Sequence, residues 1–146
     1  MTKTSGNWSI FHFLTKVSYK FRTNLNFAED IVEICNLTGM EKIQKLQLDN
    51  NIICKIQGLH ELVNLKWLDL SFNLIEKIEG LEKNRELEDL SLFSNCITEL
   101  SGLEELSKLN VLSIGRNKIV NLETTLHYLR KLKNKMQVLK IEENEF

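Results

Sequence analysis

The chain repeats itself with a period of 22 residues, and this repetition restricts it to a small group of folds. Three consecutive units, residues 43–64, 65–86 and 87–108, share the pattern L-x-x-L-x-L-x-x-N-x-I-x-x-I-x-G-L, with Ile43 for the first Leu of the first unit and Leu100 for the second Ile of the third. A fourth unit, residues 109–135, is five residues longer, and residues 136–146 open a fifth. One unit cannot bury its apolar side alone, so neighbouring units must stack and share a core. The sequence therefore predicts a solenoid that turns once per unit.

Each unit contains a short predicted strand, a recurring asparagine and, in the first three, a recurring glycine. Side chains alternate along a strand, so both leucines of L-x-L point into the core and the stacked strands form a parallel sheet. Gly58, Gly80 and Gly102 suit a tight backbone passage on the convex side. The asparagine amide can bond backbone groups of its own and of adjacent turns. We predict a structural asparagine ladder formed by Asn51, Asn73, Asn95, Asn117 and Asn144.

These features resemble the leucine-rich repeat. The fold class that follows is α/β, a leucine-rich-repeat solenoid with a short-stranded parallel sheet on its concave face. Helical or 3₁₀ turns are expected on its convex face. Residues 43–146 are predicted to hold four full repeats and a partial fifth.

The segments at both ends of the repeats are predicted to differ from them. Residues 21–42 contain a degenerate unit with Glu29 at the ladder position, and we predict that they form an N-terminal capping repeat. Residues 1–20 fit no unit and are expected to be a poorly ordered leader. The fifth unit contributes only a strand and its asparagine, which predicts an uncapped end. The chain is then truncated, continues in a longer form, or is closed by a partner.

Composition and motifs argue against several classes of function. A net charge of -1 gives no general positive field for nucleic acid, and no apolar run approaches the roughly 20 residues of a membrane helix. The three cysteines match no disulfide framework or zinc motif, which indicates a reduced, cytoplasmic protein. His12, His60 and His127 lack metal-ligand spacing, and no phosphate-binding loop is present. We predict no catalytic residue, metal, cofactor or small-molecule substrate, and therefore no enzyme.

The concave face is the predicted binding surface, because solenoids of this curvature bind partners there. The residues on either side of the inward leucines face outward and align in columns across the strands. Trp67, Phe72 and Phe93 are thereby predicted to be exposed, and aromatic residues dominate interface hot spots. Alternatively, these rings pack on one another or lie under the leader. The predicted protein-binding residues are Lys45, Gln47, Trp67, Asp69, Phe72, Asp89, Phe93 and Arg116.

A second candidate surface is the basic run in the fourth unit. Arg130, Lys131, Lys133 and Lys135 could hold an acidic partner. Alternatively, they complement the dipole at the end of a helix and stay hydrated.

The repeats also resemble a particular subclass. The 22-residue unit with I-x-x-I-x-G-L resembles the SDS22-like intracellular leucine-rich repeats. The runs LQLDNNII, LKWLDLSFNLIEKIEGL and LEDLSLFSNCI resemble the family of the leucine-rich-repeat subunit 3 of the nexin-dynein regulatory complex. This resemblance implies a non-catalytic scaffold in the axoneme of a cilium or flagellum, with axonemal complex subunits or dynein as protein partners. The alternative is a cytoplasmic adaptor, like the phosphatase-regulating relatives of the subclass.

Overall fold

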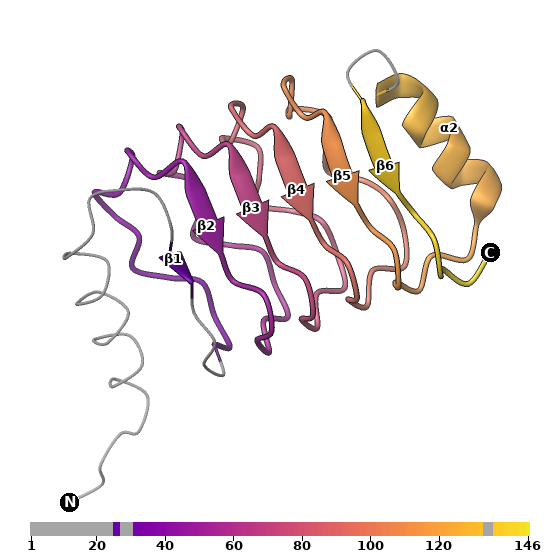
Figure 1. The fold of residues 1–146 in the computed structure, drawn as a ribbon, viewed down its shortest axis with the longest axis horizontal. Coiled ribbons are helices and arrows are strands. Elements are labelled where there is room, and N and C mark those ends of the chain that lie inside the picture. Colours follow the sequence, from indigo (N-terminus) through magenta and orange to yellow (C-terminus); the bar gives the residue numbers. More distant parts are fainter. Residues whose placement is uncertain (1–24, 27–30, 133–135) are drawn as a thin grey trace, which may run out of the picture.

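The computed structural model describes residues 25–26, 31–132 and 136–146, and its strands form one parallel sheet (Figure 1). The sheet has six strands in the order β1-β2-β3-β4-β5-β6, so each strand pairs with the next strand along the chain. The strands are β1 (Leu25–Asn26), β2 (Lys45–Gln47), β3 (Trp67–Asp69), β4 (Asp89–Ser91), β5 (Val111–Ser113) and β6 (Val138–Lys140). The predicted leucine-rich-repeat solenoid is confirmed. The predictions for residues 1–20, Glu29, Lys133 and Lys135 lie outside the described residues.

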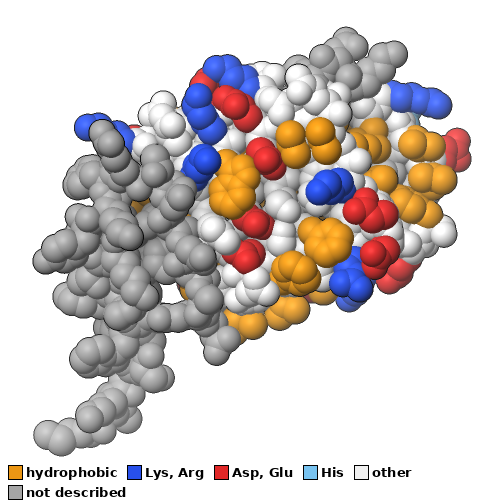
Figure 2. Space-filling model, viewed as in Figure 1, with side chains coloured by type: hydrophobic (Ala, Val, Ile, Leu, Met, Phe, Trp, Pro, Cys, Tyr) orange, Lys and Arg blue, Asp and Glu red, His pale blue; other side chains and the backbone are white. Residues whose placement is uncertain are grey.

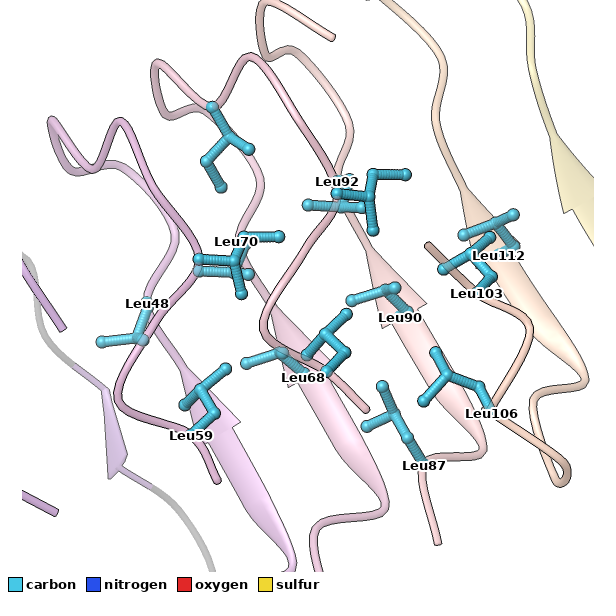
Figure 3. Packing of buried hydrophobic residues seen from close by; sticks show 14 of the residues in the cluster. Leu48, Leu59, Leu68, Leu70, Leu87, Leu90, Leu92, Leu103, Leu106 and Leu112 are labelled. Atoms are coloured by element: carbon cyan, nitrogen blue, oxygen red, sulfur yellow. The ribbon is translucent and has the colours of Figure 1, made fainter. Parts of the chain in front are cut away.

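A column of leucines forms the core behind the sheet. The middle residues of four strands, Leu46, Leu68, Leu90 and Leu112, lie in register and are fully buried. Their flanking residues are more exposed, as alternation along a strand requires. Figure 3 shows leucines of the strands meeting leucines of the opposite side of each turn. The core is therefore a continuous stack to which every repeat contributes the same positions.

The side of the solenoid opposite the sheet is built from hydrogen-bonded turns. In the first regular repeat, Leu62 N donates to Leu59 O and Leu65 N donates to Leu62 O, both at 3.0 Å. Gly80 has a φ of +73°, and a Cβ there would lie 2.5 Å from the carbonyl oxygen of Ile56. The recurring glycine is therefore required both by its left-handed backbone and by the close approach of the preceding turn.

The five extra residues of the fourth repeat accompany a helix, α2 (Leu122–Leu132), which follows β5 along the chain and is drawn at the C-terminal end of the sheet in Figure 1. Asn121 caps its start by accepting the Thr124 N–H on Oδ1 at 2.9 Å. Tyr128 accepts the backbone N–H of Leu103 at 2.8 Å, which ties the helix to the previous repeat. In β6, Leu139 is 38% exposed, whereas its partner in the adjacent strand β5, Leu112, is 0% exposed.

The recurring asparagines form a hydrogen-bonded ladder between turns. Asn73 Oδ1 accepts the N–H of Ile53 at 3.0 Å, and its Nδ2 donates to the carbonyls of Leu48 and Leu70 at 2.9 and 3.0 Å. Asn95 repeats these contacts one turn later with Ile75, Leu70 and Leu92. Each buried amide thus satisfies backbone groups of its own turn and of the preceding one. The other side chains that accept a backbone N–H of the preceding turn in this way are Asn51, Asn117 and Asn144.

Asn84 occupies a core position that is leucine in the repeats before and after it. It is fully buried, whereas the residues 22 positions before and after it are Leu62 and Leu106. Its Nδ2 donates to the carbonyls of Leu59 and Leu62 at 2.9 and 3.0 Å. Its buried Oδ1 has no hydrogen-bond partner within the described part of the chain. A buried acceptor without a partner lowers stability by about 1 to 3 kcal/mol.

Asn84→Leu is therefore expected to raise the free energy of unfolding by about 1 to 3 kcal/mol. The carbonyls that lose the amide keep their backbone donors, Leu62 N and Leu65 N, and neighbouring repeats already accommodate leucine here. Urea unfolding followed by circular dichroism measures the change. Asn84→Ala is the control and should lower stability, because it removes the amide without filling the space. A Leu variant less stable than the wild type would show that the amide itself holds the turns together.

Candidate functional site

The outward side chains of the strands align in columns on the concave face, defined here as the exposed face of β2 to β6 and of the residues that follow each strand. Trp67 lies in register with Lys45 and Asp89, and Asp69 lies in register with Gln47 and Ser91. Figure 2 shows apolar side chains separated by acidic and basic ones. The leucines between these columns are held in the core. The outward side chains of the columns are therefore free to contact a partner.

Phe72 and Phe93 form an aromatic pair just beyond the ends of β3 and β4. Their ring centroids are 5.6 Å apart at an interplanar angle of 70°, an edge-to-face contact. The guanidinium carbon of Arg116 lies 5.9 Å from the centroid of the Phe93 ring, within cation–π range. A Cβ at Gly115 would lie 3.1 Å from that ring, so the glycine leaves the space that the ring fills. Phe72 is still 46% exposed, which leaves part of this pair available to a partner.

Trp67 lies apart from this pair, at the start of β3. Its side chain is half-buried and lies close enough to the Asp89 carboxylate of the adjacent strand to lower the pKa of that group. Ser71, which precedes Phe72, and Ser91 join their hydroxyl groups at 2.7 Å. Of the three predicted aromatic residues, the structure brings Phe72 and Phe93 into direct contact.

The backbone at Phe72 is in an unusual conformation. Its φ is +55°, in the left-handed region that costs a non-glycine residue roughly 1 to 2 kcal/mol. Asn50 has the same φ of +55° one repeat earlier, and asparagine tolerates this region better than phenylalanine does. The repeat geometry imposes the conformation, so the choice of an aromatic residue there is not explained by local stability.

Asp69 and Asp89 form an acidic pair on the adjacent strands β3 and β4. Burial raises the pKa of Asp89, and the negative charge of Asp69 raises it further. Lys140 and the hydrogen bond from Trp67 act in the opposite direction but do not cancel these effects. Asp69 uses Oδ1 to accept the Ser71 N–H at 2.9 Å. The fold thus holds two carboxylates close together at some electrostatic cost.

Sequence reasoning did not identify the apolar residues that continue this surface around the edge of the sheet. Ile52 and Leu74 each follow a ladder asparagine, and they are 40% and 47% exposed. We call Ile52, Phe72, Leu74 and Phe93 the apolar edge. The sequence feature that could have revealed them is an apolar residue directly after the ladder asparagine in two successive repeats. Solvent-exposed positions of this kind usually carry polar residues.

The second predicted surface is only partly described. Arg130 and Lys131 are exposed in the last turn of α2, where positive charge complements the helix dipole. Lys133 and Lys135 lie outside the described residues, so the arrangement of the complete basic run stays a prediction.

Within residues 25–26, 31–132 and 136–146, no three His, Cys, Asp or Glu side chains are grouped to hold a metal ion. No helix in these ranges has the length and apolar composition needed to cross a bilayer.

Comparisons with known proteins agree with this architecture. A family model described as leucine-rich repeats in two copies matches residues 63–105. The chain has the leucine-rich-repeat fold. Leucine-rich repeats are typically non-catalytic interaction modules, and no enzyme is among the relatives found. No curated protein matches the sequence.

Solved structures with the same fold include an internalin, InlF, from Listeria monocytogenes, with 27% identity and a TM-score of 0.68. The match covers 79% of this chain and 33% of that one, so this chain spans about a third of the internalin. A chain of the Drosophila melanogaster SNF/U2A′ complex has 28% identity and a TM-score of 0.66. That match covers 83% of this chain and 72% of the other. The leucine-rich repeat domain of APL1B, at 17% identity and a TM-score of 0.72, matches 99% of this chain and 44% of its own, and shows the fold alone.

Phe72→Asn is expected to leave the free energy of unfolding unchanged or to raise it by up to about 1 kcal/mol. The change relieves the left-handed strain, which offsets the loss of a half-exposed ring that contacts Phe93. Chemical unfolding compares the variant with Leu70→Ala, which removes a fully buried leucine and should cost about 2 to 5 kcal/mol. If Phe72→Asn is as damaging as Leu70→Ala, the ring belongs to the core and is not a contact residue.

Asp89→Asn is expected to stabilise the protein near neutral pH and to have little effect in acid. The folded-state pKa of Asp89 is raised above its unfolded value of about 3.9. The wild type therefore loses stability as the pH rises from the unfolded-state pKa through the higher folded-state pKa of Asp89, and the uncharged variant does not. Melting temperatures of both proteins between about pH 3 and pH 7 measure the difference. A variant that is less stable at neutral pH would mean that Asp89 is held by favourable contacts.

Proposed function

We propose that this chain is a non-catalytic scaffold that holds a partner protein on its concave face. The observation that carries the proposal is Phe72, which is 46% exposed in a backbone conformation that disfavours aromatic residues. Its edge-to-face contact with Phe93 covers only part of the ring, and the local backbone conformation disfavours it, whereas aromatic rings are frequent contact residues at interfaces. The polar residues around it, including Asp69 and Arg116, would orient the partner.

We further propose that the scaffold acts in the cytoskeleton of cilia or flagella, as a subunit of the nexin-dynein regulatory complex. The support is the resemblance of its repeats, in particular LKWLDLSFNLIEKIEGL, to one family of axonemal proteins. In this role the concave face would bind another axonemal subunit or dynein, and the chain would contribute position and not chemistry.

A second candidate is a cytoplasmic adaptor or phosphatase regulator. The similarity to a chain of the SNF/U2A′ complex favours it, because that match covers 72% of a chain solved together with other macromolecular components. The two candidates use the same concave face and differ in the partner that occupies it.

Fractionation of ciliated cells tests the proposal. The tagged wild-type chain should remain with axonemes after detergent extraction, and Phe72→Asn should appear in the soluble fraction. Recovery of the chain only with a soluble phosphatase would support the adaptor instead. If wild type and variant distribute equally and neither co-purifies with another protein, the concave face is not an interaction site.

A further inference from the structure

The two carboxylates of the acidic pair, Asp69 and Asp89, lie in adjacent strands, close enough for the charge of Asp69 to raise the pKa of Asp89, while the charge of Lys140 lowers it. Many exposed acids outside the strands pair with a basic side chain of a neighbouring repeat, for example Glu105 with Arg85 at 2.8 Å and Glu86 with Lys108 at 2.6 Å. Next to the phenylalanine pair, Glu143 holds Arg116 at 2.7 Å. No described Lys, Arg or His nitrogen lies within the 4.0 Å ion-pair distance of Asp69 or Asp89.

The whole concave face is also more acidic than basic. Its strand columns carry three cationic and five acidic side chains. These are Lys45, Arg116 and Lys140 against Asp49, Asp69, Asp89, Glu142 and Glu143. An incoming acidic chain or phosphate would therefore meet net repulsion, whereas an incoming basic side chain would be attracted.

The residues around the acidic pair suit a cationic side chain of a polypeptide. Trp67 lies in register with Asp89 on the adjacent strand and is half-buried, so part of its aromatic ring is accessible beside the carboxylate. An aromatic face attracts Lys and Arg cations, and a carboxylate adds a charge-assisted hydrogen bond. The burial that raises the pKa of Asp89 also means that a cation docked there would be screened less by water.

The apolar edge lies at a fixed distance from this acidic pair. Asp89 and Phe93 are four residues apart on an extended segment, which corresponds to about 13 Å. A helix covers that distance in about eight or nine residues, and an extended peptide covers it in about four. One short segment can therefore reach both places at once.

We infer that the occupant of the concave face is a basic, amphipathic polypeptide segment, with an Arg or Lys on Asp69 and Asp89 and an apolar side chain on Phe72 and Phe93. This inference rests on the proposed scaffold function and specifies the chemistry of its partner. The acidic pair supplies charge selectivity, and the apolar edge supplies buried area.

Selection from a random peptide library displayed on phage tests the inference with the whole chain as the target. The selected peptides should be rich in Arg or Lys together with Leu, Ile or Phe. Their affinity should fall by about tenfold for the double variant Asp69→Ser with Asp89→Asn. The serine matches Ser91 and Ser113 of the same column, so this variant is expected to fold, which its melting temperature checks.

The control variant, Glu76→Gln with Glu99→Gln, removes the same charge from exposed positions outside the strand columns and should bind like the wild type. Selection of acidic or uncharged peptides would overturn the inference, as would equal binding by the Asp69 and Asp89 variant. If such peptides still lose affinity for Phe72→Asn, the concave scaffold stands and only the charge preference is wrong. If no peptide depends on either site, the proposed function fails with it.

Discussion

The asparagine ladder is the constraint on which the rest of the structure depends. A parallel coil of three-residue strands leaves many backbone groups in its connecting turns without sheet partners, and each such buried group is costly. The side chains of Asn73 and Asn95 supply both the donors and the acceptors that these turns need, at distances of 2.9 to 3.1 Å. Since each amide bridges two turns, the position of the asparagine in one repeat fixes the position of the next.

This regular spacing separates the core from the surface. Leucines at fixed places fill the interior, and the outward positions of each strand are free to carry any side chain that a partner requires. The concave face uses this freedom at a cost to stability, with a phenylalanine at a φ of +55° and two neighbouring carboxylates on adjacent strands. Some acids elsewhere pair with a basic side chain of the neighbouring repeat, for example Glu105 and Glu86. The candidate site is distinguished by combining an exposed aromatic ring with two carboxylates on adjacent strands.

The fold could be predicted from the sequence because one physical rule repeats at every unit. A period of 22 residues fixes which positions enter the core, and the strand register follows from it. The candidate site was predictable only in part, since the columns name the outward residues but not their contacts. That Phe93 packs over Gly115 and contacts Phe72 depends on side-chain conformations. Asn84 illustrates the same limit. Comparison with Leu62 and Leu106 in the neighbouring repeats shows that it is an exception, but does not show which carbonyls its side chain bonds.

The most direct test of the ladder is hydrogen exchange of the backbone amides of Ile53, Ile75 and Ile97. These N–H groups lie in turns outside the strands and donate to the side chains of Asn73, Asn95 and Asn117, each at 3.0 Å. If the ladder holds the turns together, these amides exchange as slowly as the strand amides, because they open only when neighbouring repeats unfold. Exchange as fast as in exposed loops, with the strands still protected, would contradict the account.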